Sequence, residues 1–291
     1  MQKLSDGAAF RAHGWTSGDG LRLYARVYET RHGAARTVVC LPGLTRNSRD
    51  FESLAQHLAP RYRLICPDLR GRGHSAWDPA WQNYQPAAYL ADLAALFTSL
   101  SVTRLAVVGT SLGGLLAVLL PSMLPGVVSG TILNDIGPEI DPIGAERIRG
   151  YVGRLPPVRS WEEAVAQLKT VFGTAWPGVS EPTWHRLARR SFREDERGIP
   201  RLDVDPKVGD AMRAAPSTAP DLWPVFRSLG SLPVLAIRGA LSDILSTSTF
   251  ARMQREKPDL AALSVPNRGH VPLLDEPECL AAIDAFLAGL S

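Results

Sequence analysis

The chain has 291 residues, a formal net charge of +3 and a hydrophobic content of 45%. This length and composition suit one large globular domain with room for an insertion, and they exclude a disordered or fibrous protein. The basic residues are scattered and are followed closely by acidic ones, whereas a nucleic-acid-binding protein concentrates its basic residues on one face, so we expect no nucleic-acid partner.

The first predicted element is an antiparallel hairpin at a sheet edge, over residues 14–28. Its turn is Gly18-Asp19-Gly20, which lies between two strand-like flanks. After the hairpin come short runs that are apolar on both faces, a pattern typical of strands that helices cover on both sides. These runs are residues 37–41, 62–66, 104–108, 130–133, 233–237 and, more weakly, 260–265.

Segments with apolar residues spaced three and four positions apart separate these runs and predict helices. Strands that alternate with helices indicate an α/β protein, in which a mostly parallel central sheet is flanked by helices. The predicted helices of this core are residues 51–58, 89–100, 112–123, 246–257 and 278–290.

Residues 107–124 are apolar enough to resemble a membrane span. Three glycines and Pro121 interrupt this stretch, so a strand, a tight turn and a buried helix explain it better. The first ten residues lack the apolar core of a signal peptide. We therefore expect a cytoplasmic protein that has no membrane partner.

The cysteines Cys40, Cys66 and Cys279 are odd in number and widely spaced, which does not fit a disulfide framework. Cys40 and Cys66 lie in apolar strand-like runs, where a free cysteine packs as a small hydrophobic side chain. We expect all three thiols to be reduced.

Between residues 137 and 229 the strand pattern disappears, and the chain is rich in helix formers, tryptophan, arginine and proline. Residues 161–172 and 183–192 predict amphipathic helices. We predict a helical cap subdomain of residues 139–225, inserted into an α/β core of residues 1–138 and 226–291. Trp161 and Trp176 are candidates to line a pocket beneath this cap, because such an insertion can exclude water and shape an apolar site.

The sequence GTSLGG at 109–114 places Ser111 in a G-x-S-x-G motif between a predicted strand and a predicted helix. A serine on so sharp a turn needs glycine two positions away on each side, and the helix that follows points its free amides at the site. The motif matches neither the dinucleotide-binding fingerprint nor the phosphate-binding loop. It therefore predicts that Ser111 is a nucleophile.

Among the six histidines, only His270 follows the last strong strand, in a loop that Gly269 makes adaptable. This position predicts that His270 is the general base. The acid that orients its imidazole must be an aspartate at the carboxyl end of a strand. Asp243 and Asp135 both satisfy that condition; we favour Asp243 and keep Asp135 as the alternative, or as a residue that borders the substrate.

Five motifs follow one another in an order that resembles the capped α/β-hydrolase superfamily, in particular its serine-nucleophile esterases and lactonases, over essentially the whole chain. The resemblance implies an oxyanion hole made by the backbone amides of Leu44 and Leu112. One departure is Leu41-Pro42, where relatives often carry a His-Gly-like pair. The motifs are LPGL at 41–44, PDLRGRGHS at 67–75, GTSLGG at 109–114, RGALSDIL at 238–245 and NRGHVPLLDEP at 267–277.

Together these residues predict a serine hydrolase that cleaves a carboxylic ester or lactone of a small, partly apolar molecule through an acyl-enzyme. A serine at position 111 disfavours the epoxide hydrolases and haloalkane dehalogenases among relatives, which use aspartate. We expect no cofactor and no metal, because no H-E-x-x-H motif or cysteine–histidine cluster appears.

Three alternatives stay open at this point. One is a hydrolase of carbon–carbon bonds in ring-fission products, which would need a cation such as Arg46 to bind an acidic substrate. Another is a ligand-binding receptor on the same fold, and the third is transfer of the acyl group to an acceptor other than water. The sequence indicates no particular oligomeric state.

Overall fold

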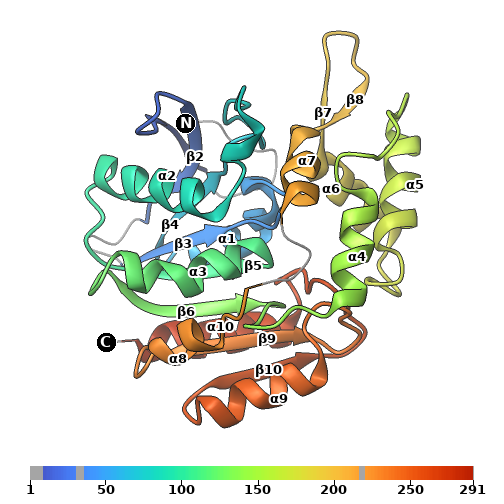
Figure 1. Cartoon of the computed structure of the whole chain (residues 1–291). Coiled ribbons are helices and arrows are strands. Elements are labelled where there is room, and N and C mark those ends of the chain that lie inside the picture. The colour runs from blue at the N-terminus through green and yellow to red at the C-terminus, as the bar shows by residue number, and fades with distance from the viewer. Residues whose placement is uncertain (1–8, 31–35, 216–219, 291) are drawn as a thin grey trace.

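An eight-stranded, mostly parallel sheet runs through the middle of the molecule (Figure 1). The computed structural model describes residues 9–30, 36–215 and 220–290. The first two strands pair antiparallel at one edge, and the other strands run parallel to one another. In sheet order the strands are β1 (Arg11–Thr16), β2 (Arg22–Tyr28), β4 (Arg63–Asp68), β3 (Thr37–Leu41), β5 (Leu105–Thr110), β6 (Val128–Asn134), β9 (Val234–Gly239) and β10 (Ala261–Val265).

The central strands are buried on both faces, as their continuous apolar runs predicted. In β3, Val39 and Leu41 pack into one hydrophobic cluster, whereas Val38 and Cys40 pack into a second cluster on the opposite face. This alternation follows from the two-residue period of a strand. Cys40 is one of three cysteines that are free and buried, as expected; the others are Cys66 and Cys279.

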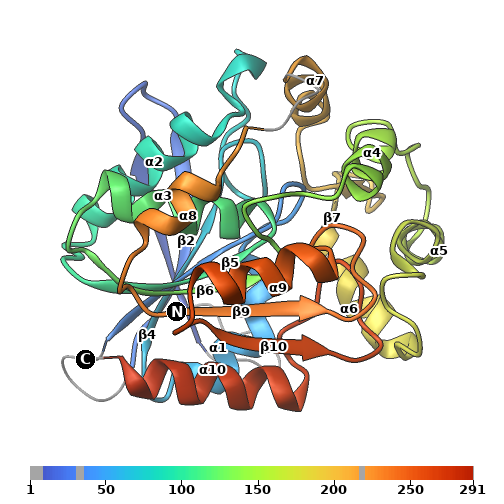
Figure 2. The ribbon, with the colours of Figure 1, turned by 60° about the horizontal axis from the view of Figure 1, so that its bottom comes forward.

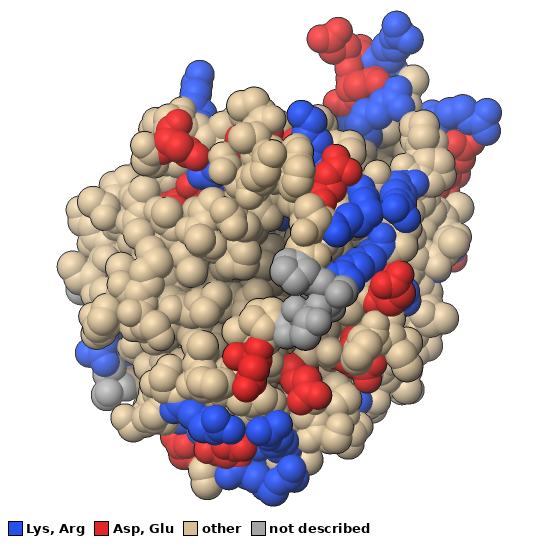
Figure 3. Space-filling model, in the orientation of Figure 1, with Lys and Arg blue, Asp and Glu red and all other residues tan. Residues whose placement is uncertain are grey.

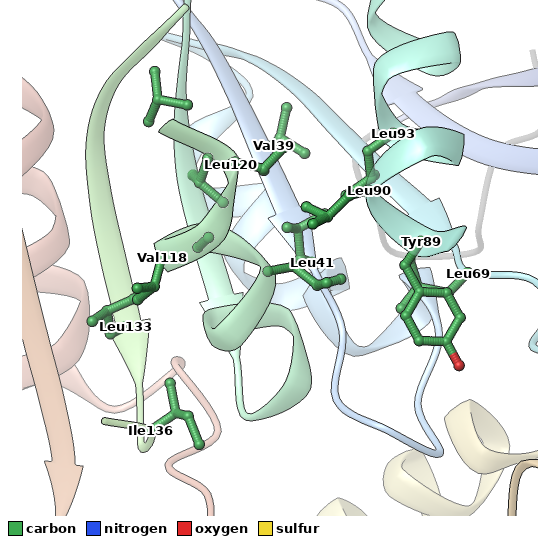
Figure 4. Close-up of a cluster of buried hydrophobic side chains, with 14 of the residues drawn as sticks. Val39, Leu41, Leu69, Tyr89, Leu90, Leu93, Val118, Leu120, Leu133 and Ile136 are labelled. Carbon is green, nitrogen blue, oxygen red and sulfur yellow. The ribbon is translucent and has the colours of Figure 1, made fainter. Parts of the chain in front are cut away.

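Helices cover both faces of the sheet (Figure 2). Helices α1 (Glu52–Leu58) and α10 (Pro277–Gly289) pack on one face, and the opposite face carries the larger cluster, part of which Figure 4 shows. This arrangement confirms the predicted α/β class. The helices on the larger cluster are α2 (Pro86–Ser99), α3 (Leu112–Met123), α8 (Trp223–Ser228) and α9 (Thr247–Glu256), and two short 3-10 helices cover Ser48–Phe51 and Trp81–Asn83.

The segment between β6 and β9 supplies most of an additional helical layer. Figure 1 shows it beyond the ends toward which the parallel strands point. Its helices are α4 (Pro142–Tyr151), α5 (Trp161–Phe172), α6 (Glu181–Ser191) and α7 (Lys207–Ala214). The predicted helix at 161–172 coincides with α5, and the one at 183–192 overlaps α6.

Our expectation that no strand lies between residues 137 and 229 is wrong. Strands β7 (Phe192–Glu194) and β8 (Pro200–Leu202) form an antiparallel hairpin that projects from the molecule (Figure 1). Each strand has only three residues, and charged side chains such as Arg193 and Glu194 are mixed with apolar ones such as Phe192. Strands of three residues are too short to carry an apolar alternation that the sequence could reveal.

The N-terminal hairpin is confirmed, since β1 and β2 pair from Arg11 opposite Val27 to Thr16 opposite Arg22. The apolar stretch at 107–124 forms the end of β5, a turn and the whole of α3. None of the helices in the described ranges is long and apolar enough to cross a membrane. On the face drawn in Figure 3, acidic and basic side chains are intermixed around a broad uncharged area.

Helix α3 approaches strands β3 and β5 so closely that two glycines are required. A Cβ atom on Gly113 would lie 2.0 Å from the carbonyl oxygen of Leu41, and one on Gly109 would lie 2.3 Å from that of Gly113. Both contacts are with backbone, which cannot move aside as a flexible side chain could. The two glycines of the G-x-S-x-G motif therefore fix the distance between helix and sheet.

Replacing Gly113 with alanine should lower the free energy of unfolding by about 3 kcal/mol, because the backbone must shift to admit a methyl group. Urea unfolding followed by circular dichroism measures this change. Gly150→Ala is the matched control, since Gly150 lies in α4 with open space around it, and it should be neutral or stabilise by about 0.5–1 kcal/mol. An unchanged stability for Gly113→Ala would contradict the close approach.

Candidate active site

Ser111 occupies the sharp turn between β5 and α3, with φ of 51° and ψ of −114°. A positive φ is uncommon for a residue with a side chain and is tolerated mainly where function requires it. The Ser111 amide donates to the carbonyl oxygen of Asn134 at 3.0 Å, and its carbonyl oxygen accepts from the Gly114 amide at 2.9 Å. These bonds hold Ser111 at the carboxyl end of β5, where the motif predicted it.

His270 connects Ser111 to a carboxylate. Its Nε2 lies 2.9 Å from Ser111 Oγ, and its Nδ1 lies 2.7 Å from Asp135 Oδ2. An ionised carboxylate can only accept, so Nδ1 carries the proton and donates it, which leaves Nε2 to accept from the Ser111 hydroxyl. The structure therefore brings together a hydroxyl, an imidazole and a carboxylate in one hydrogen-bonded chain.

Asp135 is completely buried at the end of β6, and both of its carboxylate oxygens accept hydrogen bonds from the protein. Oδ1 accepts from the Gly239 amide at 2.7 Å, and Oδ2 accepts from the Ser242 hydroxyl at 2.5 Å as well as from His270. Hydrogen bonds to an anion are stronger than those between neutral groups, and a buried charge needs them. Asp135 is thus held as a fixed anion beneath the imidazole.

The structure contradicts the prediction that Asp243 orients His270. Asp243 instead forms a bidentate ion pair with Arg147 of α4, with Nε to Oδ2 at 2.5 Å and Nη2 to Oδ1 at 2.9 Å. Burial alone would raise the pKa of Asp243, but the hydrogen bonds and charge of Arg147 hold this pKa below its ordinary value. The Asp243 side chain turns toward the helix, while its neighbour Ser242 turns toward Asp135.

Sequence position could not separate the two aspartates. Strands β6 and β9 are parallel neighbours with Asn134 opposite Ile237, so the residues that follow them, Asp135 and Asp243 among them, reach the same edge of the sheet. The direction of each side chain decides which carboxylate meets the imidazole. The sequence did not show that Arg147, nearly a hundred residues away along the chain, forms the ion pair that turns Asp243 away from His270.

Two supporting residues were also missed. Asn134 donates from Nδ2 to the carbonyl oxygen of Pro272 at 3.0 Å and to Thr110 Oγ1 at 3.2 Å, while its backbone oxygen holds Ser111. It therefore links the turn that carries Ser111 to the loop that carries His270. Ser242 lies next to Asp243 in the sequence, but only the structure shows that its hydroxyl donates to Asp135.

The amides of Leu44 and Leu112, the expected oxyanion donors, have no acceptor among the hydrogen bonds of the described residues. Leu112 begins helix α3, so its amide also lies at the positive end of the helix dipole. Arg72, which is fully buried, donates from Nε to the carbonyl oxygen of Leu44 at 2.9 Å and from Nη1 to the Tyr89 hydroxyl at 2.9 Å. Arg72, another residue the sequence did not single out, thus fixes the loop that carries Leu44.

A pocket of about 760 Å³, its open mouth included, lies above Ser111 and His270. The segment between β6 and β9 contributes a largely apolar part of its wall, in which Phe172 stacks on Trp176 with 4.9 Å between ring centroids. The residues from this segment are Ile148, Tyr151, Phe172, Trp176, Leu187 and Arg190.

The two candidate tryptophans differ in position. Trp176 lines the pocket and donates from Nε1 to the carbonyl oxygen of Val271 at 2.6 Å, so it also supports the residue next to His270. Trp161 does not line the pocket. Its indole donates to Glu194 at 2.7 Å, and the Arg189 guanidinium lies 3.6 Å from its ring centroid, which corrects our expectation for this residue.

Arg46, a candidate substrate-binding residue, lines the pocket. It is not a free cation, however, because Asp50 accepts from its Nε at 2.7 Å and from its Nη2 at 2.6 Å. Its Nη1 donates to Ser191 Oγ at 2.5 Å. The described residues contain no group of three or more histidine, cysteine, aspartate or glutamate side chains arranged to hold a metal ion.

Comparison with known proteins identifies the family. The sequence model of the alpha/beta hydrolase family matches residues 38–283, which is most of the chain. The chain belongs to the α/β-hydrolase family. It is an enzyme of the hydrolase class, as the resemblance of its motifs implied.

Several relatives of this hydrolase have named activities or solved structures. It is 33% identical over 263 residues to a 3-hydroxybutyrate-oligomer hydrolase of Cupriavidus necator, over 87% of this chain and 89% of the relative. It is 27% identical to a 2-(acetamidomethylene)succinate hydrolase of Mesorhizobium japonicum, over 88% of this chain and 89% of the relative. The crystal structure of an α/β hydrolase from Novosphingobium aromaticivorans, 42% identical, superposes with a TM-score of 0.91 over 97% of this chain and 99% of that one.

The arrangement at His270 predicts a large difference between two matched variants of this hydrolase. Asp135→Asn should lower kcat on an aryl ester by about 10⁴-fold, as loss of the corresponding anion does in a serine-protease triad. Asp243→Asn breaks only a partly exposed ion pair with Arg147 and should lower kcat by less than about tenfold. Steady-state kinetics of both variants on one ester decides the matter, and a larger loss for Asp243→Asn would contradict the geometry.

Proposed function

We propose that this hydrolase cleaves carboxylic esters through an acyl-enzyme on Ser111, with His270 as general base and Asp135 as the acid that orients it. The observation that carries the proposal is the position of His270, 2.9 Å from Ser111 Oγ on one side and 2.7 Å from Asp135 on the other. A weak nucleophile needs an adjacent base, and the base needs a third group to hold it. The chain supplies all three at one edge of the sheet.

In the first half of the reaction, Ser111 Oγ attacks the ester carbonyl carbon while His270 Nε2 takes the hydroxyl proton. The negative charge that develops on the carbonyl oxygen is stabilised by the Leu44 and Leu112 amides, each of which can contribute roughly 2.7–4 kcal/mol. The imidazolium, stabilised by Asp135, then gives its proton to the departing alcohol. The acyl group is left on Ser111.

In the second half, water attacks the acyl carbon and gives a proton to His270. Collapse of the second tetrahedral intermediate breaks the bond to Ser111, and His270 returns the proton to the Ser111 oxygen. The products are one carboxylic acid and one alcohol, and the enzyme regains its starting state. None of these steps calls on a cofactor or a metal ion.

The pocket favours a small, partly apolar substrate, an ester or a lactone. Tyr151, Phe172, Trp176 and Leu187 supply apolar surface above Ser111, and pockets of this kind hold a small molecule by burial and orient it through a few polar groups. The relatives named for 3-hydroxybutyrate oligomers and for 2-(acetamidomethylene)succinate also act on small molecules.

The carbon–carbon hydrolase alternative is less well supported. It requires a cation for an acidic, ketone-bearing substrate, and Asp50 already neutralises the suggested Arg46. A receptor without turnover is disfavoured too, because the complete hydrogen-bonded chain at His270 and the two free amides serve chemistry rather than binding alone.

We further propose that residues 139–225 act as a cap subdomain on a core of residues 1–138 and 226–291. The pocket wall contributed by α4, α5 and α6 supports this division, as does the bond from Trp176 to the loop of His270. A cytoplasmic location also belongs to the proposal, and the three free, buried cysteines are in keeping with a reducing compartment.

Ser111→Ala should abolish turnover of aryl esters, leaving no more than about 10⁻⁶ of the wild-type kcat, since the covalent route is lost. A serine-directed phosphonate should add once per chain, and peptide mass mapping should find it on Ser111. Urea unfolding of Ser111→Ala, unchanged from wild type, serves as the control for folding. Inactivation with the label on another residue would refute the assignment.

A further inference from the structure

An ion pair forms part of the pocket wall beside the nucleophile. Arg46 and Asp50 both line the pocket, with side chains 15% and 23% exposed, so neither is sealed from a substrate. Arg46 follows a turn in which its amide donates to the carbonyl oxygen of Gly43 at 3.1 Å. A Cβ atom on Gly43 would lie 3.4 Å from Arg46 Cγ and 3.8 Å from Ser111 Cβ, so the arginine stem and the nucleophile flank the same small space.

The ion pair has hydrogen-bonding capacity that the protein does not use. A guanidinium has five N–H donors and a carboxylate has about four acceptor sites. Among the hydrogen bonds of the described residues, Arg46 uses three donors, two toward Asp50 and one toward Ser191. Asp50 accepts one bond on each carboxylate oxygen, both from Arg46. The pair can therefore still donate and accept at the pocket surface.

Other cations on this wall are also engaged. Arg190 donates from Nη2 to the Ser53 hydroxyl at 2.9 Å, and its Nε lies 3.6 Å from Glu52. A substrate carboxylate near Arg46 would meet the negative charge of Asp50. A purely apolar chain would cover the pair without replacing the water that solvates it, which costs free energy. A group that both donates and accepts avoids both penalties.

The sheet order indicates which part of the ester lies against this pair. His270 gives its proton to the departing alcohol, so the alcohol lies on the His270 side. The loop of Arg46 follows β3, on one side of β5 and Ser111, whereas the loop of His270 follows β10, on the other side. The acyl chain is therefore the part that faces Arg46 and Asp50.

We propose that Arg46 and Asp50 together bind a hydroxyl group on the acyl chain, and that the enzyme prefers esters of short 3-hydroxy acids. The substrate hydroxyl donates to Asp50 and accepts from Arg46. This inference rests on the proposed ester hydrolysis at Ser111 and adds to it the class of acyl group. The Cupriavidus necator relative is named for a 3-hydroxybutyrate oligomer, in which the acyl unit at the hydroxyl end carries such a free hydroxyl.

The test compares three methyl esters in a pH-stat: methyl butyrate, methyl 3-hydroxybutyrate as separate enantiomers, and monomethyl succinate. For the wild-type enzyme, kcat/KM for the better hydroxybutyrate enantiomer should exceed that for butyrate by about tenfold or more, because hydrogen bonds to charged groups are among the stronger ones. Monomethyl succinate, which places a carboxylate near Asp50, should be the poorest of the three.

Asp50→Asn keeps the size of the side chain and removes its charge. The ratio of kcat/KM for methyl 3-hydroxybutyrate to kcat/KM for methyl butyrate should fall by about tenfold. The corresponding ratio for monomethyl succinate should rise, because Arg46 becomes an unbalanced cation. Glu163→Gln is the matched control, since Arg159 and Glu163 form an ion pair with the same four-residue spacing at the exposed start of α5, and neither side chain lines the pocket. It should leave both ratios unchanged.

The outcomes separate this inference from the proposed function. If the enzyme hydrolyses methyl butyrate as well as it hydrolyses both enantiomers of methyl 3-hydroxybutyrate, the role of the ion pair is overturned and the chemistry at Ser111 stands. Turnover that persists in Ser111→Ala would overturn the proposed function instead. If Asp50→Asn does not fold, the wild-type ratios alone decide, because a preference for succinate over hydroxybutyrate would also contradict the inference.

Discussion

A fully buried carboxylate at the end of β6 determines how the site is built. Removing Asp135 from water costs several kilocalories per mole unless its oxygens are paired. Its partners are the Gly239 amide, the Ser242 hydroxyl and the His270 imidazole, and all three lie in or after the next two strands of the sheet. Satisfying this one charge therefore fixes the end of β9 and the loop after β10, and it presents Nε2 of the imidazole to Ser111.

The helices beyond the sheet hold the same loops from the other side. Trp176 donates to the carbonyl oxygen of Val271, next to His270, and the Asp243–Arg147 ion pair ties the loop after β9 to α4. The loop that carries Leu44 is attached to α6 in the same way, since the Asn47 side chain donates to the carbonyl oxygen of Arg190 at 2.9 Å. The segment that forms part of the pocket wall thus also contacts the loops that carry His270 and Leu44.

The sequence alone was sufficient for the sheet, for the sharp turn at Ser111 and for the position of the His270 loop, because burial on both strand faces and the steric need for glycine leave direct traces in residue types. It was insufficient for the acid, since Asp135 and Asp243 follow neighbouring strands and differ only in side-chain direction and in the presence of Arg147. It also could not distinguish Trp161 from Trp176, because both are apolar residues of one helical region. The pairing of Arg46 with Asp50 was not predicted either, because Arg46 lies in a loop and its place beside Asp50 in the pocket depends on the fold.

The most direct test of this account is a crystal structure of the enzyme with a phosphonate bound to Ser111, which mimics the tetrahedral intermediate. The account predicts a phosphoryl oxygen roughly 2.7–3.1 Å from the Leu44 and Leu112 amides, with His270 Nδ1 on Asp135 and with Asp243 still paired to Arg147. An imidazole turned onto Asp243, or a phosphoryl oxygen that points away from both amides, would contradict it.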